Sequence, residues 1–475
     1  MAFAKGIPSP TSYKGPGTFR FLNKQKIFKT VDWNYSGFGK LWTYNLNYFD
    51  FLLQDGINRE TGLELMMGYL KEASGRKDGV EPYPTSVRGI NWIKFLSLHS
   101  ITDESLSAIL YKDYCRLLDN LEYHLQGNHL LENGFSLLFG ALYFRDEKFA
   151  DMARRILTLE LKEQILKDGA HCELSPMYHQ MMLYRVLDAY NLLNNNAHAL
   201  PELHSLLEKT ALKMLGWLQT ISWKDGSIPF INDAAPGIAA GTRPLLLYGE
   251  RLGLKAENMS LNCSGYRKYI SGDFEVLFDA CPILPTYQPG HTHADTLQVL
   301  LRYQGSDILV DTGTSTYEKT RRRQLERSTV SHNTVVVNNK NSSQVWGGFR
   351  VGKRAEVSIL EEDKYRIKAE HYGYSHPHRR TLTLCHRRII INDEIKGRFK
   401  SKVLLGHLHF PPGITPVKIG NSIRAGGLSF EFTAIESLDL SKYLFAREFN
   451  KLENAWKISY KFKTPCEIQI RPVKG

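Results

Sequence analysis

The stretch GHTHADTLQVLLRY, residues Gly290–Tyr303, changes from alternating polar to alternating apolar side chains. Its first half carries His291, His293 and Asp295 at every second position, and its second half carries Leu297, Val299 and Leu301. Side chains two residues apart in an extended segment point to the same face. The stretch therefore predicts a half-buried strand that presents two imidazoles and a carboxylate at its beginning.

Two more predicted strands follow, and each carries a residue of a type that binds metals. DILVDTGTSTYE contains Asp311, and RSTVSHNTVVVN contains His332. Neighbouring strands would bring His293, Asp311 and His332 together as a Zn²⁺ set with an open position, although no short motif fixes the metal. A single histidine on a strand is more often an ordinary hydrogen-bonded or surface residue, and this alternative stays open.

The composition limits the classes of partner. The chain has 475 residues, which suits two or three domains, and no segment approaches the roughly 18 uninterrupted apolar residues of a membrane helix, so we expect no membrane partner. Lys and Arg (61) exceed Asp and Glu (49) by 12, which favours anionic partners. The longest cationic cluster is only Arg321–Arg323 and no nucleic-acid motif is present, so an acidic polysaccharide fits better than nucleic acid.

The first residues of the chain and its cysteines bear on the compartment and on the redox state. The first residues, MAFAKGIPSPTSYKG, lack the charged and apolar segments of a secretory signal. The sequence as it stands predicts a bacterial cytoplasmic protein, or a periplasmic or secreted one if a signal peptide has been removed. The six cysteines are scattered without a CxxC pair, so we expect free thiols rather than a disulfide scaffold or a zinc ribbon.

The spacing of apolar residues changes once along the chain. To about Leu261 they recur at intervals of three and four, which predicts helical hairpins in series. From about Gly265 short alternating runs are separated by turn residues, which predicts a sandwich of two antiparallel sheets. We therefore divide the chain into an N-terminal extension (1–30), a helical domain (31–263) and a β-domain (264–475).

Polar residues cluster in the predicted helix GNHLLENG. The side chains of Asn128, His129 and Glu132 share roughly one helical face. Polar groups among leucines need partners or a cleft, which suits a functional site. An N-cap role for Asn128, with Glu132 in the first turn, is about as good an interpretation.

A second helix is predicted to begin in ELSPMYHQ. Ser175 is a good N-cap and Pro176 a good first helical residue, which places Tyr178 and His179 in the first turn. The partial positive charge of a helix N-terminus would attract an anionic ligand there. A first-turn tyrosine is usually an amphipathic surface residue, so position alone is a weak signal.

Other residues suit contact with a sugar polymer. In EPYPTSVRGINWIKFL, Arg88 would pair with a carboxylate, and Asn91 and Trp92 would contact a sugar ring, unless these side chains fill a helical core. Asn232 lies in the loop DGSIPFINDAAPG, which is either a cleft wall or an ordinary turn.

Taken together, these fragments resemble the heparinase II/III family of polysaccharide lyases. The resemblance rests on PYPTSVRGINWIKF, GNHLLENGFSLLFGALYF, DGAHCELSPMYHQMML, DGSIPFINDAAPG, YQPGHTHADTLQVLL and the run from DTGTSTYE to RSTVSHNTVVVN, in that order. It implies an α+β multidomain fold, with an incomplete N-terminal (α/α) toroid followed by a C-terminal antiparallel β-sandwich. It also implies β-elimination in a uronic-acid-containing anionic polysaccharide, which is a glycosaminoglycan, an alginate-like polymer or a bacterial exopolysaccharide.

By this resemblance, Asn128, Tyr178 and His291 are the catalytic residues. Asn128, helped by His129 and Glu132, would neutralise the uronate carboxylate and so stabilise the enolate-like transition state. Tyr178 would serve as base, as acid to the leaving oxygen, or as both, and His291 as general base.

The same resemblance implies a mostly structural divalent metal, with Zn²⁺ as the expected ion, bound by His293, Asp311 and His332. Asp295 would support a ligand as a hydrogen-bond acceptor. Arg327, before His332, would meet the acidic groups of the substrate or stay a solvated cation. The residues expected to bind substrate are Arg88, Asn91, Trp92, His179, Asn232 and Arg327.

Two other function classes stay open. A glycoside hydrolase on an α/α scaffold would need two carboxylates roughly 5 to 9.5 Å apart, such as Glu132 and Asp233, but would leave Tyr178 and His291 without a role. A non-catalytic polysaccharide-binding protein would keep the cleft without turnover. A homodimer stays one option for the oligomeric state.

Overall fold

The computed structural model describes residues 1–72, 75–196, 200–397 and 403–473. The chain forms two compact units, and each unit is assembled from separate stretches of sequence. The first unit consists of Met1–Ile165, Gln180–Gly216 and Arg243–Glu257, and the second of Leu166–His179, Trp217–Thr242 and Asn258–Gly475. The domain boundaries drawn from the sequence stay predictions.

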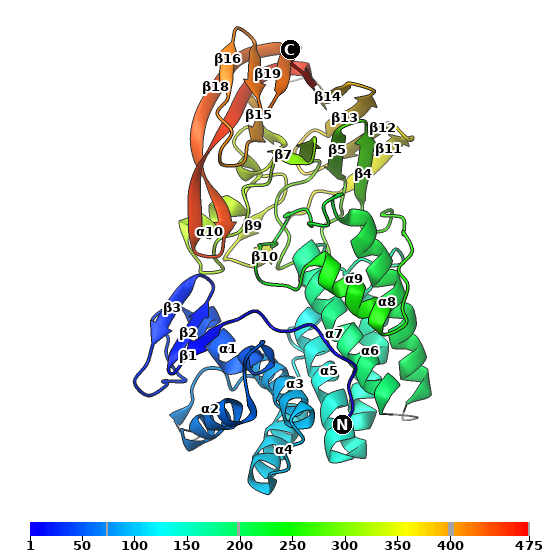
Figure 1. Ribbon diagram of the computed structural model, residues 1–475. Helices are drawn as coiled ribbons and strands as arrows, with labels where there is room; N and C mark the ends of the chain where they lie inside the picture. The colour runs from blue at the N-terminus through cyan, green and yellow to red at the C-terminus, as the bar shows by residue number, and fades with distance from the viewer. Residues whose placement is uncertain (73–74, 197–199, 398–402, 474–475) are drawn as a thin grey trace. The chain divides into compact units, whose positions relative to one another are not determined.

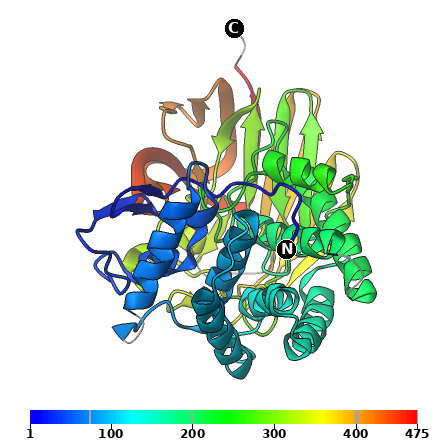
Figure 2. The ribbon, with the colours of Figure 1, turned by 60° about the horizontal axis from the view of Figure 1, so that its bottom comes forward.

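The first unit is mainly helical (Figures 1 and 2). Three of its helices, α7, α8 and α9, also contribute residues to the second unit. Among the described residues, no helix is both long enough and apolar enough to cross a membrane. The elements are β1 (Tyr13–Gly15), β2 (Thr18–Phe21), β3 (Lys24–Ile27), α1 (Lys40–Tyr48), η1 (Asp50–Leu53), α2 (Arg59–Lys71), α3 (Pro82–Leu98), α4 (Glu104–Asp119), α5 (Gly127–Phe144), α6 (Glu147–Gln164), α7 (Pro176–Asn195), α8 (Pro201–Ile221) and α9 (Thr242–Arg251).

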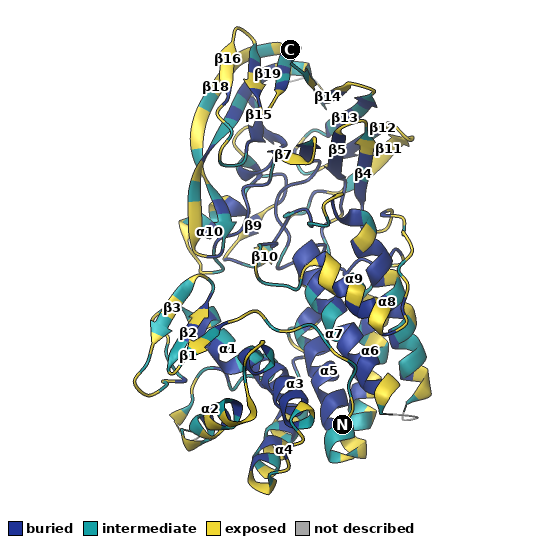
Figure 3. Ribbon diagram, viewed as in Figure 1, coloured by how far each residue is buried: buried dark blue, intermediate teal, exposed yellow. Residues whose placement is uncertain are grey.

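Helix α5 lies inside the first unit and is buried on nearly every side (Figure 3). It packs against α3 and α6. Two glycines allow α5 and α3 to approach the side chain of Tyr114 in α4 closely. A Cβ on Gly140 of α5 would lie 2.4 Å from the Tyr114 ring, and a Cβ on Gly89 of α3 would lie 2.8 Å from the Tyr114 hydroxyl. Helix α6 is amphipathic instead, and Asp146 caps its N-terminus by accepting from the Lys148 and Phe149 amides.

Two glycines of α2 give a test of this packing. A Cβ on Gly62 would lie 2.0 Å from Phe95 Cζ, whereas a Cβ on Gly68 would meet nothing within 4 Å. We expect Gly62→Ala to lower the free energy of unfolding by about 1–3 kcal/mol through overpacking. Gly68→Ala should raise it by about 0.5–1 kcal/mol, because alanine loses less backbone entropy in a helix. Thermal unfolding of both variants would contradict the packing if Gly62→Ala were as stable as Gly68→Ala.

The second unit is built mostly from antiparallel strands. A four-stranded sheet has the order β4 (Tyr266–Ser271), β5 (Phe274–Asp279), β6 (Val299–Tyr303), β7 (Ser306–Leu309). A ten-stranded sheet has the order β11 (Val357–Glu362), β12 (Arg366–His371), β13 (His378–Cys385), β14 (Arg388–Ile395), β19 (Lys451–Pro472), β18 (Leu428–Glu448), β17 (Ser422–Ala425), β16 (Val417–Ile419), and β15 (Leu404–His409) pairs with β19 and with β8 (Val335–Val337). The remaining elements are α10 (Arg321–Glu326), η3 (Thr329–Ser331), β9 (Val345–Trp346) and β10 (Arg350–Val351).

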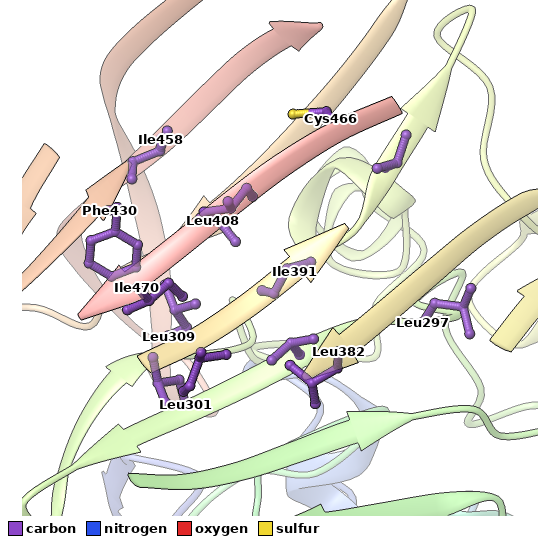
Figure 4. Close-up of a cluster of buried hydrophobic side chains, with 14 of the residues drawn as sticks. Leu297, Leu301, Leu309, Leu382, Ile391, Leu408, Phe430, Ile458, Cys466 and Ile470 are labelled. Atoms are coloured by element: carbon purple, nitrogen blue, oxygen red, sulfur yellow. The ribbon is translucent and has the colours of Figure 1, made fainter. Parts of the chain in front are cut away.

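These two sheets share one hydrophobic core (Figure 4). Leu301 of β6 belongs to the same buried cluster as Ile391 of β14 and Ile470 of β19. Burying an aliphatic side chain of this size is worth about 1.5–3 kcal/mol, so the cluster holds the sheets face to face. The prediction of a helical region followed by an antiparallel β-sandwich is confirmed, and all six cysteines are free thiols, as predicted.

The Gly290–Tyr303 stretch is a strand only in its second half. Strand β6 begins at Val299, and the residues before it lie in turns and irregular backbone. Leu297 has a φ of 63°, in the left-handed region, which a continuous strand does not contain. The prediction of a strand with polar residues at its beginning is therefore wrong in its geometry, because a loop before β6 carries His291, His293 and Asp295.

Candidate active site

In the second unit, the carboxylate of Asp233 joins side chains from distant parts of the sequence. His291 Nδ1 lies 2.9 Å from Asp233 Oδ2, and His293 Nε2 lies 2.8 Å from Oδ1. The guanidinium of Arg323 donates to both oxygens, with one terminal nitrogen 2.6 Å from Oδ2. The His291 side chain is 14% exposed, whereas those of Asp233, His293 and Arg323 are at most 1% exposed. One buried carboxylate therefore holds both histidines of the GHTH sequence.

The charges in this cluster follow from burial and from Arg323. Burial raises the pKa of Asp233, but Arg323 and the hydrogen bonds from both histidines hold it well below its ordinary value. Burial lowers the pKa of His293 to about 4, against the opposing effect of Asp233. At neutral pH the carboxylate is therefore ionised and the His293 ring is neutral.

Helix α7 brings Tyr178 to the same cluster. Ser175 Oγ accepts from the Tyr178 amide at 3.4 Å and donates to the Asp233 carbonyl at 3.0 Å, so the predicted cap at Ser175 is confirmed and ties α7 to the Asp233 loop. The Tyr178 ring packs against that of His291, with centroids 3.9 Å apart and planes tilted by 30°, and its hydroxyl lies 3.2 Å from that of Tyr317. Burial, followed by the effect of Tyr317, raises the pKa of Tyr178 well above its ordinary value, so the phenol stays protonated at neutral pH.

Three residues beside this cluster offer ligand atoms to a cation. Asp311 follows β7, His332 follows η3, and Asp295 lies in the loop before β6. Their ligand atoms all lie within 4.8 Å of one another, and the three residues are buried. His332 Nδ1 lies 2.8 Å from Asp311 Oδ2.

The surroundings of these residues fit a divalent cation. Among the described residues, His332 Nε2 and His293 Nδ1 are buried nitrogens without a hydrogen-bond partner, and the two rings lie 5.4 Å apart between centroids. Burial, followed by the charge of Asp279, raises the pKa of Asp295 well above its ordinary value, as expected for carboxylates gathered away from water. The ligand set predicted from the sequence, with His293 in place of Asp295, stays a prediction.

The first unit contains the polar residues of α5. The N-cap of α5 is Gln126, so the interpretation of Asn128 as an N-cap is wrong; Asn128 lies buried in the first turn. Glu132 is also buried, and its Oε1 lies 2.7 Å from Arg185 Nε. Burial raises the pKa of Glu132, and Arg185 opposes that effect. His129 is partly exposed, and its Nδ1 lies 3.0 Å from Glu122 Oε1.

The α3 residues that were predicted to contact sugar are buried and have partners within the first unit, and their substrate roles stay predictions. The Trp92 ring is 1% exposed and packs edge-on against Phe49 and Tyr69, so it is a core residue. The buried guanidinium of Arg88 donates to the Gly79 carbonyl at 2.8 Å and pairs with Asp113 at 3.3 Å. The buried Asn91 donates to Asp50 Oδ1 at 2.6 Å and to the Tyr48 carbonyl at 2.9 Å. These contacts use the groups that were expected to meet a sugar.

The other three residues predicted to bind substrate also have partners within the second unit, and their substrate roles stay predictions. His179 is buried and its ring lies 4.4 Å from that of Trp217. Asn232 accepts from the His293 amide at 2.9 Å and donates to the Leu174 carbonyl at 3.1 Å. Arg327 is buried and donates to the Thr292 carbonyl at 2.9 Å. Asn232 and Arg327 thus hydrogen-bond to the main chain of the segment that carries His291 and His293.

Two matches establish the family of the chain. The model described as Heparinase II/III N-terminus matches residues 85–243, and the model described as Heparinase II/III-like, C-terminal matches residues 255–471. The chain belongs to the heparinase II/III family. The matched ranges include the Tyr178 helix, the Asp233 loop and the GHTH sequence.

Relatives of this heparinase II/III chain carry lyase names. A heparin-sulfate lyase of Bacteroides stercoris is 24% identical over 352 residues, which are 67% of this chain and 51% of that protein, so the chain spans about half the length of the curated relative it matches. A crystal structure of heparinase III has a TM-score of 0.72 at 15% identity, covering 94% of this chain and 80% of that one. A chondroitin AC lyase of Streptomyces coelicolor A3, in complex with chondroitin sulphate, has a TM-score of 0.59 at 9% identity, covering 92% and 75%. These structural similarities establish the fold.

Several partners of the candidate residues in this heparinase II/III chain were missed in the sequence. Asp233 was considered only as an acid of a hydrolase, and Arg323 only as part of a cationic cluster. Tyr317 was part of a quoted strand without a role, and Arg185 was not considered. An aspartate in a Gly- and Pro-rich loop next to Asn232 was the available signal for Asp233, but its contacts with residues 58 to 90 positions away are not visible in the sequence.

Proposed function

We propose that this chain is a polysaccharide lyase that cleaves a uronic-acid-containing glycosaminoglycan by β-elimination. The observation that carries the proposal is the ring contact of Tyr178 with His291, in which Asp233 fixes the imidazole and the phenol is protonated. Such a pair offers a proton acceptor and a proton donor side by side, as elimination requires. The lyase names of the heparin-sulfate and chondroitin relatives support the same reaction and substrate class.

The reaction needs two proton transfers and no water. His291 accepts the proton from C5 of the uronate, and the electron pair of that C–H bond forms the C4–C5 double bond. The bond from C4 to the glycosidic oxygen breaks, and the leaving oxygen takes a proton from the Tyr178 hydroxyl. Because burial keeps this phenol neutral, we assign Tyr178 as the acid and His291 as the base.

The carboxylate next to C5 must be neutralised for the proton to leave, because a negative carboxylate disfavours the enolate-like transition state. We assign this role to the Asn128 side chain, which can donate from its amide, with His129 and Glu132 as supporting residues. Within the first unit, the ion pair of Glu132 with Arg185 fixes one face of α5 beside Asn128. A glycoside hydrolase is less favoured, because the carboxylates of Glu132 and Asp233 are each tied to an arginine.

A divalent ion, with Zn²⁺ as the expected identity, completes the proposal, held by His293, Asp311 and His332 with Asp295 close enough to join them. When bound, it would cross-link the segments that follow β7 and η3 to the loop that carries His291. Removal of the ion with a chelator is expected to lower Tm by roughly 5–10 °C. This corresponds to the loss of about 2.7 kcal/mol of stability, the contribution of a ligand present at about 100 times its Kd.

Two controls make the chelation test specific. His332→Gln should bind less than one equivalent of metal by elemental analysis, and its Tm should not respond to the chelator. Gly68→Ala, in the first unit, should bind metal and respond as the wild type does. An unchanged wild-type Tm together with no bound metal would reject the metal site.

The test of the lyase proposal is ultraviolet absorbance of the unsaturated uronate. The protein is incubated with heparan sulfate, chondroitin, hyaluronan, alginate and bacterial exopolysaccharides, and reducing ends are measured in parallel. Absorbance that rises with the reducing ends on a glycosaminoglycan is expected. Reducing ends without absorbance would indicate a hydrolase, and neither signal on any polymer would favour a binding protein.

A further inference from the structure

The contacts of Asp233 specify where hydrogen atoms lie in two imidazoles. Asp233 Oδ2 forms hydrogen bonds with His291 Nδ1 and with one Arg323 nitrogen. Asp233 Oδ1 forms hydrogen bonds with His293 Nε2, with the other Arg323 nitrogen and with Thr314 Oγ1, the last at 3.4 Å. An ionised carboxylate is only an acceptor. Each histidine nitrogen that faces it must therefore carry a hydrogen.

We propose that Asp233 is a positioning residue that sets opposite tautomers in the two histidines, with the hydrogen on Nδ1 of His291 and on Nε2 of His293. His291 then has a bare Nε2, and His293 has a bare Nδ1, which is the buried atom without a partner among the described residues. The same carboxylate thus prepares one ring to accept a proton and the other to bind a cation. The use of Nε2 as the base rests on the proposed lyase function, but the two tautomers do not.

Backbone contacts fix the carboxylate relative to the two rings. The Asp233 amide donates to the His291 carbonyl at 3.1 Å, and the His293 amide donates to Asn232 Oδ1 at 2.9 Å. The loop at Asn232 and the GHTH segment are therefore joined through main chain as well as side chains. Neither ring can exchange its nitrogens without breaking a hydrogen bond to Asp233.

Arg323 holds the carboxylate from its other side. Its Nε donates to the Gly348 carbonyl at 3.1 Å, and its guanidinium lies over the rings of Tyr317 and Phe349, at 5.0 and 5.3 Å from their centroids. A guanidinium that is fixed in this way orients the carboxylate through two parallel hydrogen bonds. An ion pair that served stability alone would need Arg323 and Asp233 but not the two histidines.

The first experiment uses the wild-type protein and no substrate. Histidine rings labelled with ¹⁵N are observed by long-range ¹H–¹⁵N correlation at about pH 8.5, two units above the ordinary histidine pKa of about 6.5, and assigned with single His→Gln variants. We expect a protonated Nδ1 with a bare Nε2 in His291, and the reverse in His293 before metal is added. The same tautomer in both rings, or the opposite assignment, would overturn the proposal.

The second experiment replaces the carboxylate and compares it with a matched control. Asp233→Asn places an amide donor against a histidine nitrogen, so at least one of the two rings should change tautomer. The control, Asp393→Asn, replaces the carboxylate of a similar buried cluster. In that cluster Asp393 accepts hydrogen bonds from His378 Nε2 at 2.7 Å and from Arg380 Nε at 2.8 Å. Both variants should lose stability, but only Asp233→Asn should change the signals of His291 or His293. Unchanged signals in Asp233→Asn would overturn the proposal.

Kinetics then separate positioning from stability. Asp233→Asn should lower kcat by at least about 10²-fold with KM nearly unchanged, because the tautomer affects the proton transfer and not binding. The double variant Asp233→Asn/Arg323→Met also removes the Arg323 cation, which Asp233→Asn leaves unpaired. It should therefore recover stability, but it should not recover kcat or the wild-type tautomers of His291 and His293. Recovery of kcat would reduce Asp233 to an ion-pair partner. If the wild type cleaves no polymer, the lyase proposal fails while the NMR result still decides the role of Asp233.

Discussion

Tyr178→Phe is expected to lower kcat by about 10²- to 10⁴-fold, the usual contribution of a positioned proton donor. The variant keeps the ring that packs against His291 and removes only the hydroxyl, so KM should change little. Burial raises the pKa of this phenol, so the wild-type group carries its proton at neutral pH and can give it to the leaving oxygen. The rate of absorbance increase at saturating substrate measures the effect.

Tyr374→Phe is the matched control for this prediction. Tyr374 is a buried tyrosine of the second unit whose hydroxyl donates to the Val335 carbonyl at 2.7 Å. Removal of that hydroxyl should cost about 1 kcal/mol of stability and leave kcat within a factor of two or three. Wild-type kcat in Tyr178→Phe would remove Tyr178 from the reaction, and an equal loss in both variants would mean that stability, not chemistry, is being measured.

Arg380→Met is expected to lower the free energy of unfolding by about 3–5 kcal/mol, the usual result of leaving one partner of a buried ion pair unpaired. Arg380 on β13 donates to both oxygens of Asp393 on β14, at 2.8 and 2.9 Å, and no side chain in this pair reaches solvent. It also donates to the carbonyls of Leu297 and Asn333, at 2.8 and 2.6 Å. The variant therefore loses one ion pair and two hydrogen bonds from the Arg380 side chain to main-chain carbonyls.

The adjacent Arg379 provides the comparison. It lies on the opposite face of β13, where its partly exposed side chain pairs with Glu370. Arg379→Met should cost about 1–2 kcal/mol, because water can replace part of that interaction. Denaturant unfolding of the two variants would contradict the buried role of Arg380 if the losses were equal.

Local rules of the sequence predicted much of the fold. The change from spacings of three and four to alternation predicted the helical and β regions, and Ser175 with Pro176 predicted the start of α7. These features depend on neighbouring residues, so they are readable without tertiary structure. The loop before β6 was misread, because its alternation matches a strand while Leu297 turns the chain through the left-handed region.

The site was harder to predict because burial is decided by distant parts of the chain. Arg88 and Trp92 have the chemistry of sugar contacts, but α3 lies inside the first unit and turns them to Asp113 and to Phe49. The GHTH sequence indicated two functional histidines, yet the carboxylate between them comes from 58 residues earlier. Chemistry was therefore readable in the motif, and its orientation was not.

The way the chain passes between its two units has a consequence for synthesis on the ribosome. The polypeptide passes from one unit to the other after residues 165, 179, 216, 242 and 257. Most of the helical unit is therefore synthesised before the C-terminal part of the second unit, with which segments 166–179 and 217–242 belong. Arg323, which pairs with the Asp233 carboxylate, is synthesised 90 residues after Asp233. Until then its loop can stay hydrated, and the site forms only after the segment that contains Arg323 has been synthesised. A fragment that begins at residue 264 would contain the GHTH histidines but neither Asp233 nor Tyr178, so a half-length product cannot carry this site.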